Sequence, residues 1–256
     1  MPGGGARYRI VYFGPLLGLG VGDGRHVSLS AVAKSNSPNT PYCVANEVIC
    51  AEIGRFLGLP IPPAGVIYAP NGTQLFYASL DFNLAGNDLP PVNVTKCVKL
   101  LPKESAGVLL FDMLIANSDR HGQNFSVDFL SRPPKMNVFD HGHAMFGKDT
   151  GKGGARLHKL RDRLAVSGGS LTQGNRHSLI DQIDSDVHFG YWLDRMKQIP
   201  DFFIEDLCQE VVGLGCDEKE AEMAISFLKY RRAKLGQIIQ ANKNEFPRIR
   251  SWRLFQ

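Results

Sequence analysis

The sequence has no long uninterrupted hydrophobic run. A membrane-spanning helix needs roughly 18 consecutive apolar residues, and the best candidate, Gly107–Ala116, is interrupted by Asp112. The apolar stretch Ile10–Gly22 follows two arginines, as in a signal peptide, but Pro15 and four glycines favour a loop or a strand. Neither a three-residue nor a heptad repeat is present, which excludes collagen-like and coiled-coil proteins. We therefore expect a globular protein with no membrane contact.

Cysteine is scarce and irregularly spaced. The five cysteines form no Cys-x-x-Cys pair, and their odd number argues against a disulfide framework or a zinc ribbon. Unpaired cysteines are usual in reducing compartments, so we expect a cytoplasmic protein. Apolar residues make up 43% of the 256 residues and charged residues 21%. These proportions are ordinary for a folded chain and exclude intrinsic disorder.

Positive charge is concentrated at the end of the chain. The whole sequence carries +4, but residues 229–256, the basic end, hold eight basic residues and one acid. The basic end therefore carries +7 and the first 228 residues carry −3. Such a cluster attracts acidic surfaces, so an acidic protein partner or a nucleic acid is a candidate ligand. The alternative is a solvated helix face and tail.

The first 80 or so residues predict a small sheet with one helix. The turn dipeptides Asp23-Gly24 and Asn71-Gly72 each stand between short stretches of strand-forming residues, which indicates two hairpins. Apolar residues then recur at helical spacing until Gly58 and Pro60 supply a stop signal. The expected strands cover residues 16–21, 27–34, 66–68 and 74–80, and the expected helix covers residues 42–57.

The rest of the chain predicts a helical region. Residues 83–95 are rich in Gly, Asn and Pro and are expected to form a linker. Asp217 and Glu220 have the spacing of a capping box at a helix start. Helices are expected at residues 103–116, 178–185, 201–212 and 218–242. The predicted fold is α+β and two-lobed, with a sheet-plus-helix N-lobe at residues 1–83 and a mostly helical C-lobe at residues 84–256.

A β-hairpin is predicted between two of these helices. Two short apolar segments flank the turn at Pro133-Pro134. If the turn is centred on the residue before these prolines, Phe125 lies opposite Phe139, and Asn124 lies opposite Asp140. Residues opposite each other on paired strands are about 5 Å apart, close enough to share one metal ion.

Three polar residues around this hairpin point to phosphoryl transfer. Asp119 lies on the loop before the hairpin, and Asn124 and Asp140 lie at its ends. Phosphoryl transfer from a nucleotide needs magnesium to neutralise the phosphates and a carboxylate to orient the attacking hydroxyl. Carboxylate and amide oxygens are suitable ligands for magnesium. The alternative is a polar turn stabilised by Asp and Asn hydrogen bonds.

The same residues form a pattern that resembles a known family. Asp119-Arg120-His121-Gly122-Gln123-Asn124, followed by Asp140-His141-Gly142, resembles the catalytic segment of the HipA-like serine/threonine kinases and, more distantly, of the phosphatidylinositol kinases. Upstream, Ser30-Ala31-Val32-Ala33-Lys34 resembles the strand that ends in the ATP-phosphate lysine. Asn46-Glu47 resembles the helix that carries its partner glutamate. The resemblance extends over about residues 10–240 and implies a two-lobed protein-kinase-like fold.

The resemblance implies an ATP- and magnesium-dependent kinase that transfers the γ-phosphate to a hydroxyl, expected to be a serine or threonine of a protein. Asp119 would orient or deprotonate that hydroxyl, and Asn124 and Asp140 would bind magnesium. Lys34 would contact the α- and β-phosphates, held in place by Glu47.

The phosphate-binding loop matches the family less well. By its position, Gly14 and the three residues after it would cover the phosphates, although the Gly-x-Gly-x-x-Gly pattern of protein kinases is absent from the sequence. The resemblance does not specify the phosphate acceptor, an antitoxin partner or the oligomeric state.

Two other functions use some of the same residues. In a metal-dependent phosphohydrolase, His121, Asp140, His141 and His143 would bind a transition metal, but Lys34 would then have no role. In a pseudokinase scaffold, the nucleotide would bind without phosphoryl transfer.

Overall fold

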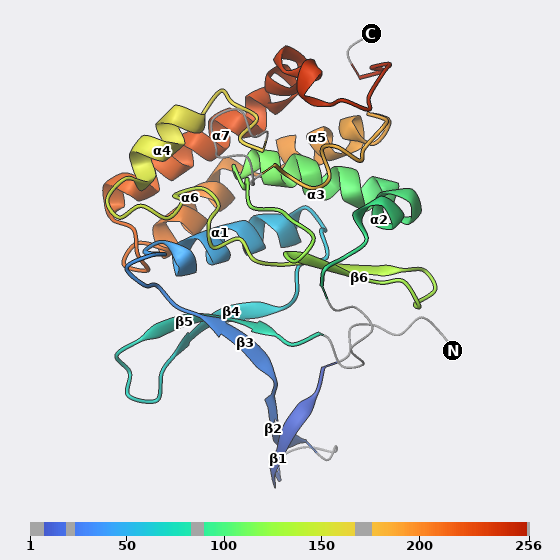
Figure 1. Cartoon of the computed structure of the whole chain (residues 1–256). Helices are drawn as coiled ribbons and strands as arrows, with labels where there is room; N and C mark the ends of the chain where they lie inside the picture. Colours follow the sequence, from blue (N-terminus) through green and yellow to red (C-terminus); the bar gives the residue numbers. More distant parts are fainter. Residues whose placement is uncertain (1–7, 19–23, 83–89, 167–175, 255–256) are drawn as a thin grey trace.

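The computed structural model describes residues 8–18, 24–82, 90–166 and 176–254. This part of the chain is a mixed α/β structure with small antiparallel sheets and seven α-helices. The helices gather on one side, and strands β1 to β5 lie on the other (Figure 1). In chain order the elements are β1 (Ile10–Leu16), β2 (Arg25–Leu29), β3 (Ala31–Lys34), α1 (Cys43–Phe56), β4 (Ala64–Tyr68), β5 (Leu75–Leu80), α2 (Val94–Leu100), α3 (Pro102–Leu114), β6 (Phe125–Asp128), β7 (Lys135–Val138), α4 (Gly153–Leu160), α5 (Phe189–Lys197), α6 (Asp201–Glu210), α7 (Glu218–Ala241) and the 3-10 helix η1 (Lys243–Glu245).

The first strands form two sheets where the sequence predicted one hairpin. β1 pairs with β2 in a two-stranded ribbon, and β3 belongs to a three-stranded sheet in the order β3-β5-β4. Ser30 separates β2 from β3: its N–H donates to the Arg9 carbonyl (3.2 Å), and its carbonyl accepts from the Asp81 N–H (2.9 Å). The expected strand at residues 27–34 is therefore split. The expected first strand at residues 16–21 overlaps β1 only at Leu16, and its last three residues lie outside the described part.

The hairpin β4–β5 and helix α1 agree with the prediction. Gly72, in the expected turn, has φ of +70°, a conformation that favours glycine. Helix α1 ends at Phe56, and Gly58 follows two residues later with φ of +77°. Almost every residue of α1 is buried, because the helix packs against β5 and β4 and also against α6. It is therefore a central helix that is mostly apolar, with Asn46 and Glu47 buried near its start and the Glu52–Arg55 ion pair partly exposed near its end.

Three of the four helices expected in the second half are present as α3, α6 and α7, within about two residues of the predicted ends. The Asp217–Glu220 capping box of α7 is formed in both directions. The helix expected at residues 178–185 was wrong, since this segment forms turns. Its first backbone donors are used elsewhere: the Ser178 N–H donates to the Arg120 carbonyl (2.9 Å), and the Leu179 N–H donates to the His177 ring (3.2 Å).

Helices α2, α4 and α5 were not predicted. Helix α4 begins with Gly153-Gly154, which are poor helix formers. Tertiary packing explains their presence, because a Cβ atom on Gly154 would lie 2.4 Å from the Met223 Sδ of α7. In α5 the buried apolar residues do follow helical spacing, a pattern that the prediction overlooked. Within the described residues, no helix has both the length and the apolar character needed to cross a membrane.

Candidate active site

The hairpin β6–β7 is shifted by one residue from the predicted register. Phe125 lies opposite Val138, not Phe139. The turn is tighter than expected because the Asp128 carboxylate accepts the N–H groups of Leu130 (2.8 Å) and Ser131 (3.2 Å). Asn124 consequently faces Phe139, and Asp140 lies two residues beyond Val138, the last paired residue of β7.

Asp140 leaves the strand in a left-handed conformation, with φ of +64°. Its carboxylate Oδ1 lies 2.7 Å from the Lys34 Nζ. The same Nζ lies 2.6 Å from the Oε1 of Glu47. The structure thus joins the end of β3, the middle of α1 and the loop after β7 at one ammonium group. The Lys34–Glu47 contact is the one that the family resemblance implied.

Glu47 is the buried member of this cluster. Its side chain is only 2% exposed, while that of Asp140 is 43% exposed. Burial by itself would raise the pKa of Glu47, but the hydrogen bond to His141 and the charge of Lys34 outweigh burial and lower this pKa to about 2. Burial also opposes the charge of Lys34, but Glu47 and then Asp140 outweigh it, and the pKa of Lys34 is raised. Both partners of the pair are therefore ionised at neutral pH.

Helix α1 also fixes the loop that follows Asp140. The His141 N–H donates to the Glu47 Oε1 (3.1 Å), and the Asn46 side chain donates to the Gly142 carbonyl (2.8 Å). The Asn46 Oδ1 accepts the Phe146 N–H (3.2 Å). Two adjacent residues of α1 thereby hold both ends of the segment from His141 to Phe146.

A buried ion pair supports the loop that carries Asp119. Arg120 and Asp112 are both fully buried, and the guanidinium donates to both carboxylate oxygens, at 2.8 and 3.0 Å. A third guanidinium nitrogen donates to the carbonyls of Asn124 and Phe139, and so ties the loop to both strands of the hairpin. The sequence prediction assigned no role to this pair. The available signal was Asp112 itself, a carboxylate inside an apolar helix that must find a partner when buried.

Two further side chains complete the surroundings of Asp112. Asn117 donates to its Oδ1 (2.8 Å), and the His177 Nε2 lies 2.9 Å from its Oδ2. Burial is the largest effect on His177 and lowers its pKa, so the neutral ring donates from Nε2 while its Nδ1 accepts the Leu179 N–H. No local pattern in the sequence marks His177, which is 65 residues from Asp112.

Asp119 and Asn124 are held together by the backbone. The Asn124 side chain donates to the Asp119 carbonyl (2.7 Å), and the Asp119 N–H donates to the Asn117 Oδ1 (3.1 Å). The Asp119 carboxylate is left partly exposed, with the His143 Nδ1 at 3.5 Å and the His121 Nε2 at 3.9 Å. The hydrogen bond from His143 is the largest effect on the pKa of Asp119 and lowers it. Asp119 is therefore an ionised carboxylate that faces solvent.

The Asp119–His143 pair predicts a measurable titration. The hydrogen bond to Asp119 raises the pKa of His143 above its ordinary 6.5, and the Asp119 pKa lies below its ordinary 3.8. Protonated His143 should therefore stabilise the folded state fully below pH 6.5, and this contribution should be lost as pH rises through the raised pKa of His143. Ionised Asp119 should stabilise the folded state above pH 3.8, and this contribution should be lost as pH falls through the lowered pKa of Asp119. NMR titration should show His143 titrating above 6.5, and Asp119→Asn should move it back toward 6.5; a His143 pKa that Asp119→Asn leaves unchanged would contradict the pairing.

Asn124 and Asp140 each keep an oxygen atom of the kind that magnesium prefers. Because Asn124 donates through Nδ2, its Oδ1 remains as an acceptor, and it makes no hydrogen bond within the described residues. The second carboxylate oxygen of Asp140 is likewise without a hydrogen bond among these residues. An amide oxygen and a carboxylate are hard ligands, and magnesium takes its remaining ligands from phosphates and water.

The histidines do not form the transition-metal site that the phosphohydrolase function would require. In the described ranges, no group of three or more His, Cys, Asp or Glu side chains could hold a metal ion. His141 is buried, with its Nδ1 3.4 Å from the Glu47 Oε2, while His143 contacts Asp119. His141 therefore lies against Glu47 and the other two rings lie against Asp119, and the described residues do not supply the metal site that the phosphohydrolase hypothesis needs.

Gly14 lies apart from these residues. It is in the middle of β1, in the ribbon that extends away from the helices (Figure 1). A Cβ atom at this position would lie 2.9 Å from the Cβ of His26, so glycine allows β1 and β2 to approach closely. The structure places Gly14 in strand β1, and its expected part in covering the phosphates stays a prediction.

The Lys34–Glu47 pair meets one carboxylate-bearing loop, that of Asp140, which is how the lysine–glutamate pair and the metal-binding aspartate of a protein kinase are arranged. The family model for the HipA-like kinase matches residues 31–211. This match covers more than half of the sequence, and the chain belongs to the HipA-like kinases.

Comparison with solved structures shows a similar fold in CtkA, a proinflammatory kinase of Helicobacter pylori. The sequence identity is 16% and the TM-score is 0.56, over 86% of this chain and 94% of CtkA. HipA of the Shewanella oneidensis MR-1 toxin–antitoxin system, solved with HipB and operator DNA, matches with 15% identity and a TM-score of 0.47. That match covers 86% of this chain but 62% of HipA. Comparison with curated protein sequences finds no significant match.

Proposed function

We propose that this protein is an ATP- and magnesium-dependent kinase that transfers the γ-phosphate to a serine or threonine hydroxyl of a protein. The observation that carries the proposal is the contact of Lys34 with both Glu47 and Asp140. It brings the lysine expected to bind phosphates to the carboxylate expected to bind magnesium. The proposal includes the two-lobed layout, with an N-lobe at residues 1–83 and a C-lobe at residues 84–256.

Lys34 is the proposed phosphate-binding group. Glu47 is buried and fixed by α1, so it holds the ammonium in place, whereas the more exposed Asp140 is free to exchange partners. Binding of nucleotide would let Lys34 donate to the phosphates while Asp140 and Asn124 turn their oxygen atoms to magnesium. The bound ion would neutralise the phosphate charge. The Lys34–Asp140 contact is then a feature of the nucleotide-free protein.

Asp119 is the proposed base. Its carboxylate is ionised and partly exposed. Its loop is held in place by the buried ion pair of Arg120 with Asp112. It would accept the proton of the attacking hydroxyl as the new oxygen–phosphorus bond forms at the γ-phosphorus. The bond between that phosphorus and the β–γ bridging oxygen breaks, and ADP leaves with the electron pair.

The cytoplasm is the proposed location, because the five cysteines are all unpaired and buried. Nothing in this arrangement selects one protein acceptor. The acceptor can be identified by incubating the protein with labelled ATP and a cell lysate and analysing the labelled proteins by mass spectrometry.

The proposal predicts that metal binding depends on nucleotide. Magnesium should bind weakly to the protein alone and much more tightly with a non-hydrolysable ATP analogue, because the phosphates supply several ligands. Asp140→Asn should remove magnesium-dependent ATP turnover, while His143→Ala should keep a substantial part of it. Calorimetry and a turnover assay measure these effects.

Two other outcomes would refute the proposal. Tight magnesium–nucleotide binding without any turnover on a whole lysate would indicate a pseudokinase scaffold. Stoichiometric zinc in the purified protein, lost in His143→Ala, would restore the hydrolase that the geometry argues against.

A further inference from the structure

The basic end does not form one continuous basic surface. In its helical half, Lys229 pairs with Asp201 and Glu205, and Arg232 pairs with Asp201. Arg231 is fully buried and donates only to backbone carbonyls. In the described part of the chain, no carboxylate forms an ion pair with the three arginines that follow η1, namely Arg248, Arg250 and Arg253. The uncompensated charge is therefore concentrated in this last segment.

Apolar side chains fix the segment that carries these arginines. Phe246 and Ile249 are 3% and 6% exposed. The Phe246 ring lies 5.1 Å from the Trp252 ring, and both contact Phe189 of α5. Phe246, Ile249 and Trp252, at intervals of three residues, thus pack inward, and the three arginines beside them are exposed. A tail that served only for solubility would need no such anchoring.

Hydrogen bonds hold the same segment at both ends. The Oδ2 of buried Asp186 accepts the backbone N–H groups of Arg253 and Leu254, both at 2.8 Å. At the other end, the Arg248 guanidinium donates to the Gln182 side chain (3.3 Å). Fixing the backbone in advance lowers the entropy lost when a ligand binds the arginines.

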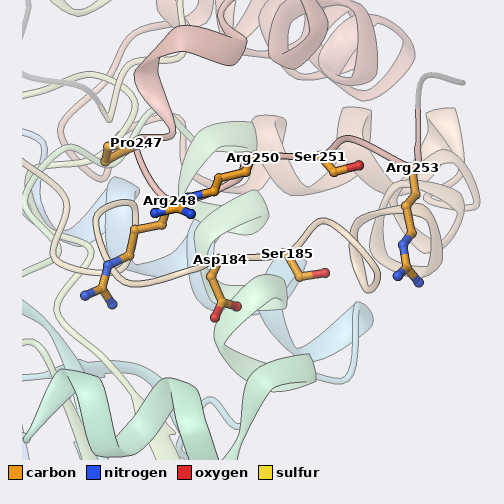
Figure 2. A pocket seen from close by; sticks show the side chains of 7 residues that line it. All are labelled: Asp184, Ser185, Pro247, Arg248, Arg250, Ser251 and Arg253. Atoms are coloured by element: carbon orange, nitrogen blue, oxygen red, sulfur yellow. The ribbon is translucent and has the colours of Figure 1, made fainter.

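A pocket of about 660 Å³ opens between this segment and the loop beneath it. Figure 2 shows the three arginines on the C-terminal segment at the top of the view, and Asp184 with Ser185 on the loop below it. The hydroxyl groups of Ser185 and Ser251 also line the pocket. Guanidinium groups with nearby hydroxyls are the donors that recognise phosphate, and arginine does so with two parallel hydrogen bonds.

We infer that this pocket binds the phosphate of a phosphorylated side chain in a protein partner. The choice of a protein partner rests on the proposed function, since a protein kinase meets phosphorylated proteins as products and substrates. Asp184 gives the pocket one acceptor, suited to a backbone N–H of the partner. A duplex nucleic acid fits less well, because it needs a run of basic contacts along its backbone. In α7, Lys229 and Arg232 are paired and Arg231 is buried, which leaves Lys234 as an isolated exposed charge.

The pocket adjoins the support of the candidate active site. Gln182, which binds Arg248, also accepts the hydroxyl of Thr95 in α2 (3.0 Å). Four residues earlier, the Ser178 N–H donates to the carbonyl of Arg120. One segment therefore contacts the phosphate pocket and the loop that carries Asp119.

The test uses the full-length protein and point substitutions, because truncation would remove Phe246 and Trp252 from the core. The probe is a short neutral peptide with one phosphoserine, compared with the unphosphorylated peptide by fluorescence anisotropy. Arg250→Gln and Arg253→Gln should each weaken phosphopeptide binding roughly tenfold or more, the usual effect of losing a charge-assisted hydrogen bond. Lys234→Gln is the matched control, since Lys234 is an exposed residue of the basic end outside the pocket, and it should change binding less than twofold.

Three results would overturn the inference. The first is equal affinity for the phosphorylated and unphosphorylated peptides. The second is a loss of phosphopeptide affinity in Lys234→Gln as large as in Arg250→Gln. The third is displacement of the phosphopeptide by a DNA duplex, with every basic substitution weakening DNA binding to the same extent. ATP turnover without a partner should not change in Arg250→Gln. Failure of the proposed kinase activity would therefore appear in the turnover assay, and failure of the pocket would appear in the peptide assay.

Discussion

Asp119→Asn is expected to lower phosphoryl transfer by about 10²–10⁴-fold, the range typical for loss of a general base, while nucleotide affinity stays within a few-fold of the unmodified protein. The reason is the position of Asp119: it contacts neither Lys34 nor Asp140 in the described structure, and its carboxylate faces solvent between His121 and His143. Single-turnover kinetics with labelled ATP and equilibrium binding of an ATP analogue separate the two effects.

Asp149→Asn supplies the control for this experiment. Asp149 is exposed on a loop after Asp140, so its substitution removes the same charge without touching the candidate base. It should leave both transfer and binding unchanged. Near-normal turnover in Asp119→Asn would exclude Asp119 as the base, and an equal loss in both variants would indicate a general effect of charge.

Arg120→Met is expected to destabilise the fold by about 3–5 kcal/mol, because it leaves the Asp112 carboxylate buried without its cationic partner. Both side chains are fully buried, so solvent cannot compensate for the loss. The loop would also lose its bonds to the carbonyls of Asn124 and Phe139. Urea unfolding measures the free energy of unfolding directly.

The double variant Asp112→Asn with Arg120→Met tests the cause. It removes the buried charge together with its partner, and the amide oxygen can still accept from one of the two neighbouring donors, Asn117 or His177. The double variant should therefore be more stable than Arg120→Met alone. If the stability losses of the two single variants simply added, it would be less stable. A double variant as unstable as that sum, or an Arg120→Met cost near 1 kcal/mol, would contradict the role assigned to this pair.

The sequence was sufficient for the parts that depend on local chemistry. Helix α1 and the β4–β5 hairpin follow from apolar spacing, the Gly58 stop and the Asn71-Gly72 turn, which act over a few residues. The start of α7 follows from the Asp217 capping box for the same reason. The family resemblance, carried by the loop at Asp119 and by the Lys34 and Glu47 segments, is confirmed by the family match.

Other features depend on residues that are distant in the chain, and only the tertiary structure decided them. The hairpin register moved by one residue because Asp128 tightened the turn, and this moved Asp140 beyond the strand to Lys34. The segment at 178–185 became turns because its first donors bind the Arg120 carbonyl and the His177 ring. The basic end was read from the sequence as one charged region, but in α7 Lys229 and Arg232 are paired and Arg231 is buried, so most of the available charge lies on the last arginines. Hydrogen bonds and ion pairs between distant residues have no period in the sequence, and for that reason composition and spacing could name the candidate residues but not show which of them meet.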